Sequence, residues 1–172
     1  DYDQDSDLDL LILHRDGLNQ TEYNLLYQNN GDGTFTDVTA LAGLSLQNHL
    51  SFCAAFFDFN NDGWLDIYIA NDKTVTHNLL YKNNGDGTFT DVSVSSQSDI
   101  VMDAMSTAIG DYNKDGFFDI YITNTSNGNV FLKNNTDGTF TDIATSTNTT
   151  FNSVGWGSVF LDADLDTDLD LY

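Results

Sequence analysis

Hydrophobic residues occur in short runs along the chain, and each run is bounded by Asn, Asp or Gly. The runs at 54–57, 67–69 and 79–81 are rich in residues of high β-propensity. The stretch 89–92 alternates apolar and polar side chains, as a half-buried strand does. Before it, the glycines within 83–87 can adopt a positive φ and close a hairpin. No segment has a sustained helical period and Pro is absent, so the pattern predicts an all-β fold of short strands.

Two motifs recur along the chain in constant phase. The first is an acidic turn, found at 1–9, 58–66, 111–119 and 162–170. The second reads LLYKNNGDGTFTDVS at 79–93 and recurs at 25–39 and 131–144. The period is about fifty residues with about four strands, which is typical of a β-propeller blade. We expect a single array of four-stranded blades, with about three complete units and partial end blades, divided near 1–50, 51–104, 105–153 and 154–172.

The two ends of this array are predicted to be incomplete. Three complete units are too few to close a ring, since propellers typically have roughly four to eight blades. The first blade is expected to lack its first strand, and the last to have only its first strand and turn. The chain also begins inside a motif, which suggests a mature or trimmed piece of a longer protein. The rest of a longer propeller, or further copies of this chain, would cover the open edges.

The composition points to a bound cation. A formal net charge of -22 arises from 27 acidic and 5 basic residues, and more than half of the acidic residues lie in the four acidic turns. Such a surface repels nucleic acid and anionic lipid, and no apolar run is long enough to span a bilayer. We therefore expect no nucleic-acid partner and no membrane insertion. Clustered carboxylates also repel one another, and a bound cation is the simplest way to neutralise this repulsion.

The spacing within an acidic turn predicts which atoms would hold this cation. In 58-DFNNDGWLD-66, every second position offers an oxygen: the side chains of Asp58, Asn60, Asp62 and Asp66, and the carbonyl of Trp64. Gly63 permits a sharp bend after the third ligand. Oxygen donors without His or Cys select Ca²⁺ or Mg²⁺ over zinc, and the number of donors favours Ca²⁺. The spacing follows the first half of a helix-flanked calcium loop but lacks its Glu at position twelve, so we expect weak binding.

The same register assigns donors in the other three turns. The third turn offers Asp111, Asn113, Asp115, the Phe117 carbonyl and Asp119. The first offers Asp1, Asp3, Asp5, the Asp7 carbonyl and Asp9, and the fourth offers Asp162, Asp164, Asp166, the Asp168 carbonyl and Asp170. Ser6 and Thr167 replace the Gly in these last two turns, which makes the bend harder. A solvated acidic loop is the alternative, but it does not explain the repeated register.

The acidic turn followed by DIYI and then by NLLYKNNGDGTFTDV resembles the FG-GAP/VCBS repeat family, whose best-known relative is the calcium-binding propeller head of integrin α chains. The resemblance covers nearly the whole chain. It implies a seven-bladed extracellular propeller with calcium in blade loops, serving adhesion or ligand recognition. The Phe-Gly and Gly-Ala-Pro motifs of the integrin version are missing, so the chain is closer to the bacterial-type repeat. Integrin-like ligand binding therefore does not carry over.

A non-enzymatic extracellular module for adhesion or recognition of a protein or glycan is the function that the sequence favours. Two alternatives stay open. The chain could be a structural subunit that assembles head-to-tail into a filament or ring. It could also be a lectin-like module with aromatic residues stacked on sugars, although a core position between blades is the simpler interpretation of Trp64, Trp156, Phe117 and Tyr112.

Other candidate sites have weaker support. His14, His49 and His77 occupy unrelated positions in the units, so they form no catalytic set, and the lone Cys53 is best explained as a small buried hydrophobe. Carboxylates committed to calcium are poor proton donors, so we expect no enzymatic activity. Four Asn residues stand in glycosylation acceptor triplets: Asn19, Asn124, Asn134 and Asn148.

Overall fold

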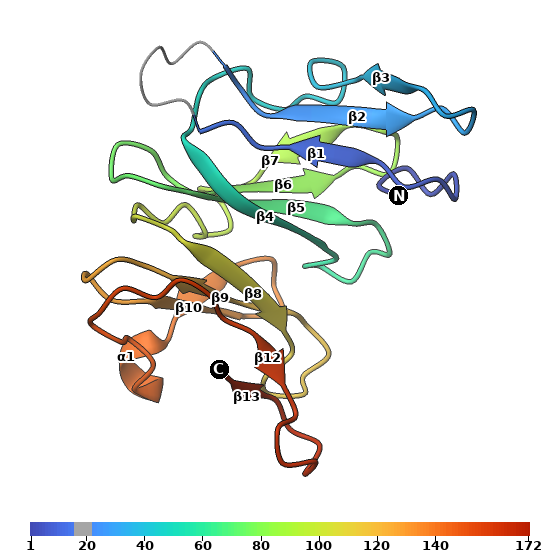
Figure 1. Ribbon diagram of the computed structural model, residues 1–172. Coiled ribbons are helices and arrows are strands. Elements are labelled where there is room, and N and C mark those ends of the chain that lie inside the picture. The colour runs from blue at the N-terminus through green and yellow to red at the C-terminus, as the bar shows by residue number, and fades with distance from the viewer. Residues whose placement is uncertain (16–21) are drawn as a thin grey trace.

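The computed structural model describes residues 1–15 and 22–172, and it confirms an all-β fold of antiparallel sheets (Figure 1). Strands follow chain order within each sheet, so every sheet is a meander of hairpins. The two four-stranded sheets contain β4 (Ser51–Phe57), β5 (Asp66–Asn71), β6 (Leu79–Asn83) and β7 (Phe89–Asp91), and β8 (Ser106–Gly110), β9 (Asp119–Thr123), β10 (Val130–Asn134) and β11 (Phe140–Asp142). We call them the second and third sheets.

Smaller sheets flank these two in the described part of the chain. The first sheet contains β1 (Leu10–Ile12), β2 (Leu25–Asn29) and β3 (Phe35–Asp37), and the fourth contains β12 (Phe160–Leu161) and β13 (Asp170–Leu171). A single helical turn, α1 (Ala144–Thr147), follows β11, where the sequence predicted no helix. No helix among the described residues combines the length and the apolar character needed to cross a bilayer.

β5 is buried along its whole length because a neighbouring sheet packs on each of its faces. Tyr68 and Ala70 belong to the apolar core between the second and third sheets. Ile67 and Ile69 belong to the core between the first and second sheets. A strand with apolar contacts on both faces needs a continuous apolar run, which explains the sequence IYIA in this strand.

The third and fourth sheets pack in the same way through a smaller core. Tyr121 and Phe131 are buried there, and Phe160 and Leu171 pack against them. Gly110 allows this approach, because a Cβ atom at this position would lie only 2.8 Å from the Phe160 ring. The four sheets of the described residues therefore form a face-to-face stack with a propeller-like arrangement.

Backbone hydrogen bonds join each four-stranded sheet to the sheet before it. The N–H of Phe89, at the start of β7, donates to the carbonyl of Ala42 in the loop after β3, at 2.7 Å. The N–H of Phe140, at the start of β11, donates in the same way to Ser96 in the loop after β7, at 2.8 Å. The outermost strand of one sheet thus contacts the loop that leaves the preceding sheet.

Buried Asn side chains make a second kind of contact between sheets. Asn83 and Asn134 end β6 and β10, and both are almost completely buried. The amide nitrogen of Asn83 donates to the carbonyl of Tyr2 at 2.8 Å, and that of Asn134 donates to the carbonyl of Phe59 at 2.8 Å. Both acceptors occupy the second position of an acidic turn, so each turn is tied to the following sheet.

Candidate functional site

The four acidic turns lie along one side of the stack (Figure 1). The first precedes β1, and the others connect β4 to β5, β8 to β9 and β12 to β13. These connections always join the first strand of a sheet to its second, so face-to-face stacking brings the turns next to one another. We number the positions of each turn from one to nine.

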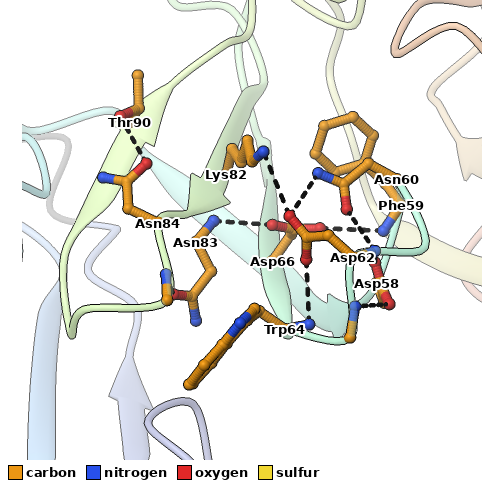
Figure 2. A network of polar contacts seen from close by, with 12 residues as sticks. Asp58, Phe59, Asn60, Asp62, Trp64, Asp66, Lys82, Asn83, Asn84 and Thr90 are labelled. Atoms are coloured by element: carbon orange, nitrogen blue, oxygen red, sulfur yellow. Dashed lines mark hydrogen bonds and ion pairs between the residues drawn. The ribbon is translucent and has the colours of Figure 1, made fainter.

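Within the second turn, carboxylate and amide oxygens are held by backbone N–H groups of the same turn (Figure 2). The two carboxylate oxygens of Asp58 accept from the N–H groups of Asp62 and Gly63, at 3.1 and 2.8 Å. The side-chain oxygen of Asn60 also accepts from Asp62 N–H, at 3.1 Å. Hydrogen bonds to these backbone N–H groups therefore hold the side chains of positions one and three against the backbone at positions five and six. The third turn repeats these contacts with Asp111, Asn113 and Asp115.

The Asp at position nine has a different environment from the other donors. Asp66 is fully buried, and its two oxygens accept from the N–H groups of Asn83, at 2.7 Å, and Phe59, at 3.0 Å. Burial raises the pKa of Asp66 to about 7. Asp119 makes the same pair of contacts, and burial raises its pKa to about 6. These carboxylates join the turn to the third strand of their own sheet, a role that the ligand spacing did not indicate.

The first and fourth turns gather three carboxylates each. In the first turn, one oxygen from each of Asp1, Asp3 and Asp9 lies within 4.8 Å of the others, and in the fourth the same holds for Asp162, Asp164 and Asp166. This donor set contains oxygen alone and fits a hard dication such as Ca²⁺. These two turns contain four further predicted donors. They are Asp5 at position five, Asp7 and Asp168 at position seven, and Asp170 at position nine.

The bend at position six has the predicted backbone conformation in all four turns. Gly63 and Gly116 have φ values of 89° and 87°, which cost a glycine little. Ser6 and Thr167 adopt φ values of 79° and 80° at the same position. A side chain is strained in this region, so the first and fourth turns carry the harder bend that the sequence indicated.

A lysine side chain reaches the second turn and would compete with a cation for its carboxylates. The ammonium group of Lys82, on β6, lies 3.2 Å from a carboxylate oxygen of Asp62 (Figure 2). Gln28 holds the equivalent place on β2 and donates to Asp3 at 2.6 Å. The residue before the Asn that ends the strand, Gln28 in β2 and Lys82 in β6, therefore reaches the turn of its own sheet, and in the second sheet it brings a positive charge.

The aromatic residues expected between blades are exposed to different degrees. Trp64 and Phe117 are only half-buried, and Trp156 is 70% exposed, so the interpretation of these three as core is wrong. Tyr112 does pack toward the core, with its ring centre 4.8 Å from that of Phe131. The Trp64 ring instead covers Gly85 and lines a cleft of about 410 Å³ between the first and second sheets.

A second cavity, of about 490 Å³, lies between the third sheet and the segment 149–172. Between the second and third sheets, Met102 and Ala104 pack in the core that contains Tyr68. Ser153 and Gly155 stand at the corresponding positions of the next repeat and fill less volume. The cavity is thus an incompletely filled space between sheets.

The remaining candidates from the sequence form no further site in the described residues. The His49 ring contacts the Ser45 hydroxyl at 3.0 Å and lies beside His77, with no contact to Cys53. Cys53 lies 3.1 Å from the Thr107 hydroxyl, and burial raises the pKa of its thiol, which makes it unreactive.

Two of the predicted glycosylation acceptors are corrected by the structure. Asn124 and Asn134 are 4% and 0% exposed, and their amide nitrogens donate to backbone carbonyls, so neither has space for a glycan in the folded chain. Asn148 is exposed and stays a prediction, while Asn19 lies outside the described residues.

The sequence is similar to a known repeat family and to two curated proteins. The sequence model of the FG-GAP-like repeat matches residues 1–69, 58–122 and 111–172. Cartilage acidic protein 1 of Xenopus tropicalis is 37% identical over 89 residues, which are 49% of this chain and 13% of that protein. The Homo sapiens protein of the same name is 42% identical over 53 residues, or 31% of this chain and 8% of that protein. The chain thus spans only a small part of these relatives.

A solved structure of a lectin from Agrocybe aegerita has a similar fold. It is described as specifically recognising non-reducing terminal N-acetylglucosamine, and it aligns with a TM-score of 0.53 at 22% identity. The alignment covers 99% of this chain and 44% of the lectin chain. At this identity the likeness concerns the fold alone.

Proposed function

The chain belongs to the FG-GAP-like repeat family, and from this premise we propose that it is a non-enzymatic extracellular recognition module whose acidic turns bind Ca²⁺. In this proposal the cation stabilises a propeller-like stack of sheets, and the surface of the stack binds a protein or glycan ligand. When bound, Ca²⁺ would neutralise the turn carboxylates. The residues of this chain orient those carboxylates and connect them to the neighbouring sheet.

One observation carries the proposal. Each of the first three turns holds several carboxylates, and the side chain of the one at position nine is inaccessible to solvent. In the first two turns the carbonyl at position two also accepts from a buried Asn of the following sheet. Buried and clustered carboxylates are costly unless a positive charge compensates them. Extracellular modules bind Ca²⁺ at roughly 10⁻⁴ to 10⁻³ M. We expect an affinity in this range for turns without the Glu at position twelve, and such an affinity would suit an extracellular location.

Thermal unfolding in millimolar CaCl₂ and in EDTA tests cation binding. We expect a higher melting temperature in CaCl₂, and we expect the difference to shrink in a variant with both Asp58→Asn and Asp62→Asn. Asp86→Asn is the matched control, because Asp86 is an exposed hairpin carboxylate whose contacts to Thr88 an Asn side chain can keep. Equal melting temperatures in both buffers for the unmodified chain would contradict the proposal.

Recognition of a glycan is the form of ligand binding that the cleft beside Trp64 favours. Besides this ring, the cleft is lined by Asp3, Gln28, Asp86 and Thr88. An aromatic surface with a few convergent polar groups is typical of small-ligand sites, and sugars offer both an apolar face and hydroxyl groups. The fold shared with a lectin is compatible with this role.

Titration with N-acetylglucosamine oligosaccharides, followed by tryptophan fluorescence and calorimetry, tests this second proposal. We expect binding that Trp64→Ala abolishes and that Trp156→Ala leaves unchanged, since Trp156 is exposed and does not line the cleft. Binding that survives Trp64→Ala would move the ligand site elsewhere. Absence of binding to any oligosaccharide tested would favour a protein ligand.

A further inference from the structure

Side chains at position four connect each acidic turn to the next. The amide nitrogen of Gln4 donates to the carbonyl of Gly63 at 2.7 Å, and the amide nitrogen of Asn61 donates to the carbonyl of Gly116 at 2.8 Å. The third turn continues the series through its own position-four residue, Lys114, whose ammonium group lies 3.3 Å from the Thr167 hydroxyl. Two carboxamides and one ammonium group thus connect position four of one turn to position six of the next, the amides to a backbone carbonyl and the ammonium group to a hydroxyl.

The backbone at position four is held in a conformation that non-glycine residues rarely adopt. Gln4, Asn61 and Lys114 have φ values of 61°, 58° and 59°. Such a conformation costs energy in the absence of compensating contacts. Leu165 has the same conformation, with φ of 64°, but its apolar side chain has no donor and is 85% exposed. The fourth turn therefore lacks an onward connection of this kind.

The connections made by Gln4 and Asn61 each end on a peptide group that also holds a predicted cation ligand. The carbonyl of Gly116 accepts from Asn61, while the N–H on the other side of the same peptide, that of Phe117, donates to Asp115 at 2.9 Å. In the second turn, Gly63 accepts from Gln4, and the next N–H donates to a carboxylate oxygen at 3.1 Å. A peptide held on both sides transmits a displacement from one turn to the next.

We propose that Gln4 and Asn61 are positioning residues that couple neighbouring acidic turns, so that a dication bound in one turn favours binding in the next. The proposal rests on the cation binding proposed above. Asn61 lies between two predicted ligands, Asn60 and Asp62, so a cation that fixes these ligands also fixes Asn61. The peptide before Phe117 is then already ordered, which lowers the ordering cost of binding in the third turn.

Terbium luminescence sensitised by Trp64 can follow the second turn when Asp3→Asn is part of the background, because Asp3 of the first turn lines the same cleft as Trp64. In a Trp156→Phe background Trp64 is the remaining tryptophan, and because it lies in the second turn it sensitises terbium bound there. Asp111→Asn removes one ligand charge from the third turn and keeps the shape of the side chain. By reciprocity, this change should weaken terbium binding in the second turn by about fivefold, the equivalent of one net hydrogen bond.

Asn61→Gly removes the connecting amide and keeps a residue that tolerates positive φ. In this variant, Asp111→Asn should no longer change the affinity of the second turn. Leu165→Gly is the matched control, since it makes the same backbone change where no onward contact exists, and here the effect of Asp111→Asn should remain. Amide hydrogen exchange gives a metal-free measurement: Phe117 N–H should exchange faster in Asn61→Gly than in Leu165→Gly.

The outcomes separate the two proposals. Terbium binding in the second turn with no response to Asp111→Asn would overturn the coupling and leave the cation sites intact. No sensitised luminescence at any terbium concentration would overturn the cation site of the second turn and the coupling with it. A response to Asp111→Asn that persists in Asn61→Gly would assign the coupling to other contacts, and position four would lose its proposed role.

Discussion

Replacing Asn134 by Ala should destabilise the stack far more than the same replacement of Asn29. Both residues occupy the same place in the repeat, at the end of the third strand of a blade unit. Asn134 is fully buried, and its amide nitrogen donates to the Phe59 carbonyl of the preceding sheet and, at 3.3 Å, to the Phe118 carbonyl of its own sheet. The amide nitrogen of Asn29 donates to the Leu8 carbonyl of its own sheet.

The size of the difference follows from these contacts. Asn134→Ala leaves the buried Phe59 carbonyl without its donor and also removes the acceptor of the Thr136 N–H. Leaving a buried polar group unsatisfied costs roughly 1–3 kcal/mol, and an ordinary hydrogen bond contributes roughly 0.5–1.5 kcal/mol. We therefore expect a loss of about 2–4 kcal/mol for Asn134→Ala and about 1 kcal/mol for Asn29→Ala.

Urea unfolding at saturating calcium, followed by far-ultraviolet circular dichroism, measures both variants. A shift in midpoint at constant slope reports a change in stability. Asn83→Ala should behave like Asn134→Ala, because Asn83 makes the same contact to Tyr2. Equal losses for Asn29→Ala and Asn134→Ala would show that the contact between sheets adds nothing, and this would refute the reasoning.

Three further predictions concern single positions. Gly85→Ala should cost more stability than Gly87→Ala in thermal unfolding, because both have positive φ but only a Cβ at 85 meets a side chain, at 2.9 Å; equal costs would exclude a steric cause. Lys82→Met should tighten terbium binding in the second turn by about threefold, because it removes a partly exposed ion pair with Asp62; unchanged affinity would mean that the lysine does not compete. Burial lowers the pKa of His49, so the imidazole takes up a proton at higher pH in the unfolded chain than in the folded one. Stability should therefore fall as pH drops below about 6.5. His49→Gln should lose less stability than the unmodified chain between pH 7.5 and 5.5, and an equal loss of stability would exclude this residue as the cause.

The repeat made much of the fold predictable from the sequence. Residues 67–69 form part of β5 and 79–81 part of β6, and the Gly-containing segment 83–87 closes the β6–β7 hairpin, as predicted. These features depend on neighbours in the chain. The hairpin motif also recurs three times at a constant period, which makes a chance match improbable. The carboxylates of positions one, three and five lie close together in the fourth turn for the same reason, since all of them belong to one tight turn.

Contacts between sheets could not be predicted in the same way. Asn134 was interpreted as a glycosylation acceptor, but its main partner is Phe59, 75 residues earlier. The recurrence of Asn at 29, 83 and 134 was visible, yet nothing in one repeat indicates which atom of another repeat it will meet. Trp156 was placed in the core between blades because of its position in the repeat, whereas its side chain is exposed.

Two kinds of hydrogen bond between neighbouring sheets, those from backbone N–H groups and those from buried Asn side chains, share a direction that matters during synthesis, while the position-four contacts run the opposite way. In both kinds, the donor belongs to the later sheet and the acceptor to the earlier one, as for Phe89 with Ala42 and Asn83 with Tyr2. A ribosome releases the acceptors first, and domains generally begin to fold from the N-terminal side as the chain emerges. Each new sheet therefore finds its docking surface already made, so the stack is suited to growth by one repeat at a time during translation.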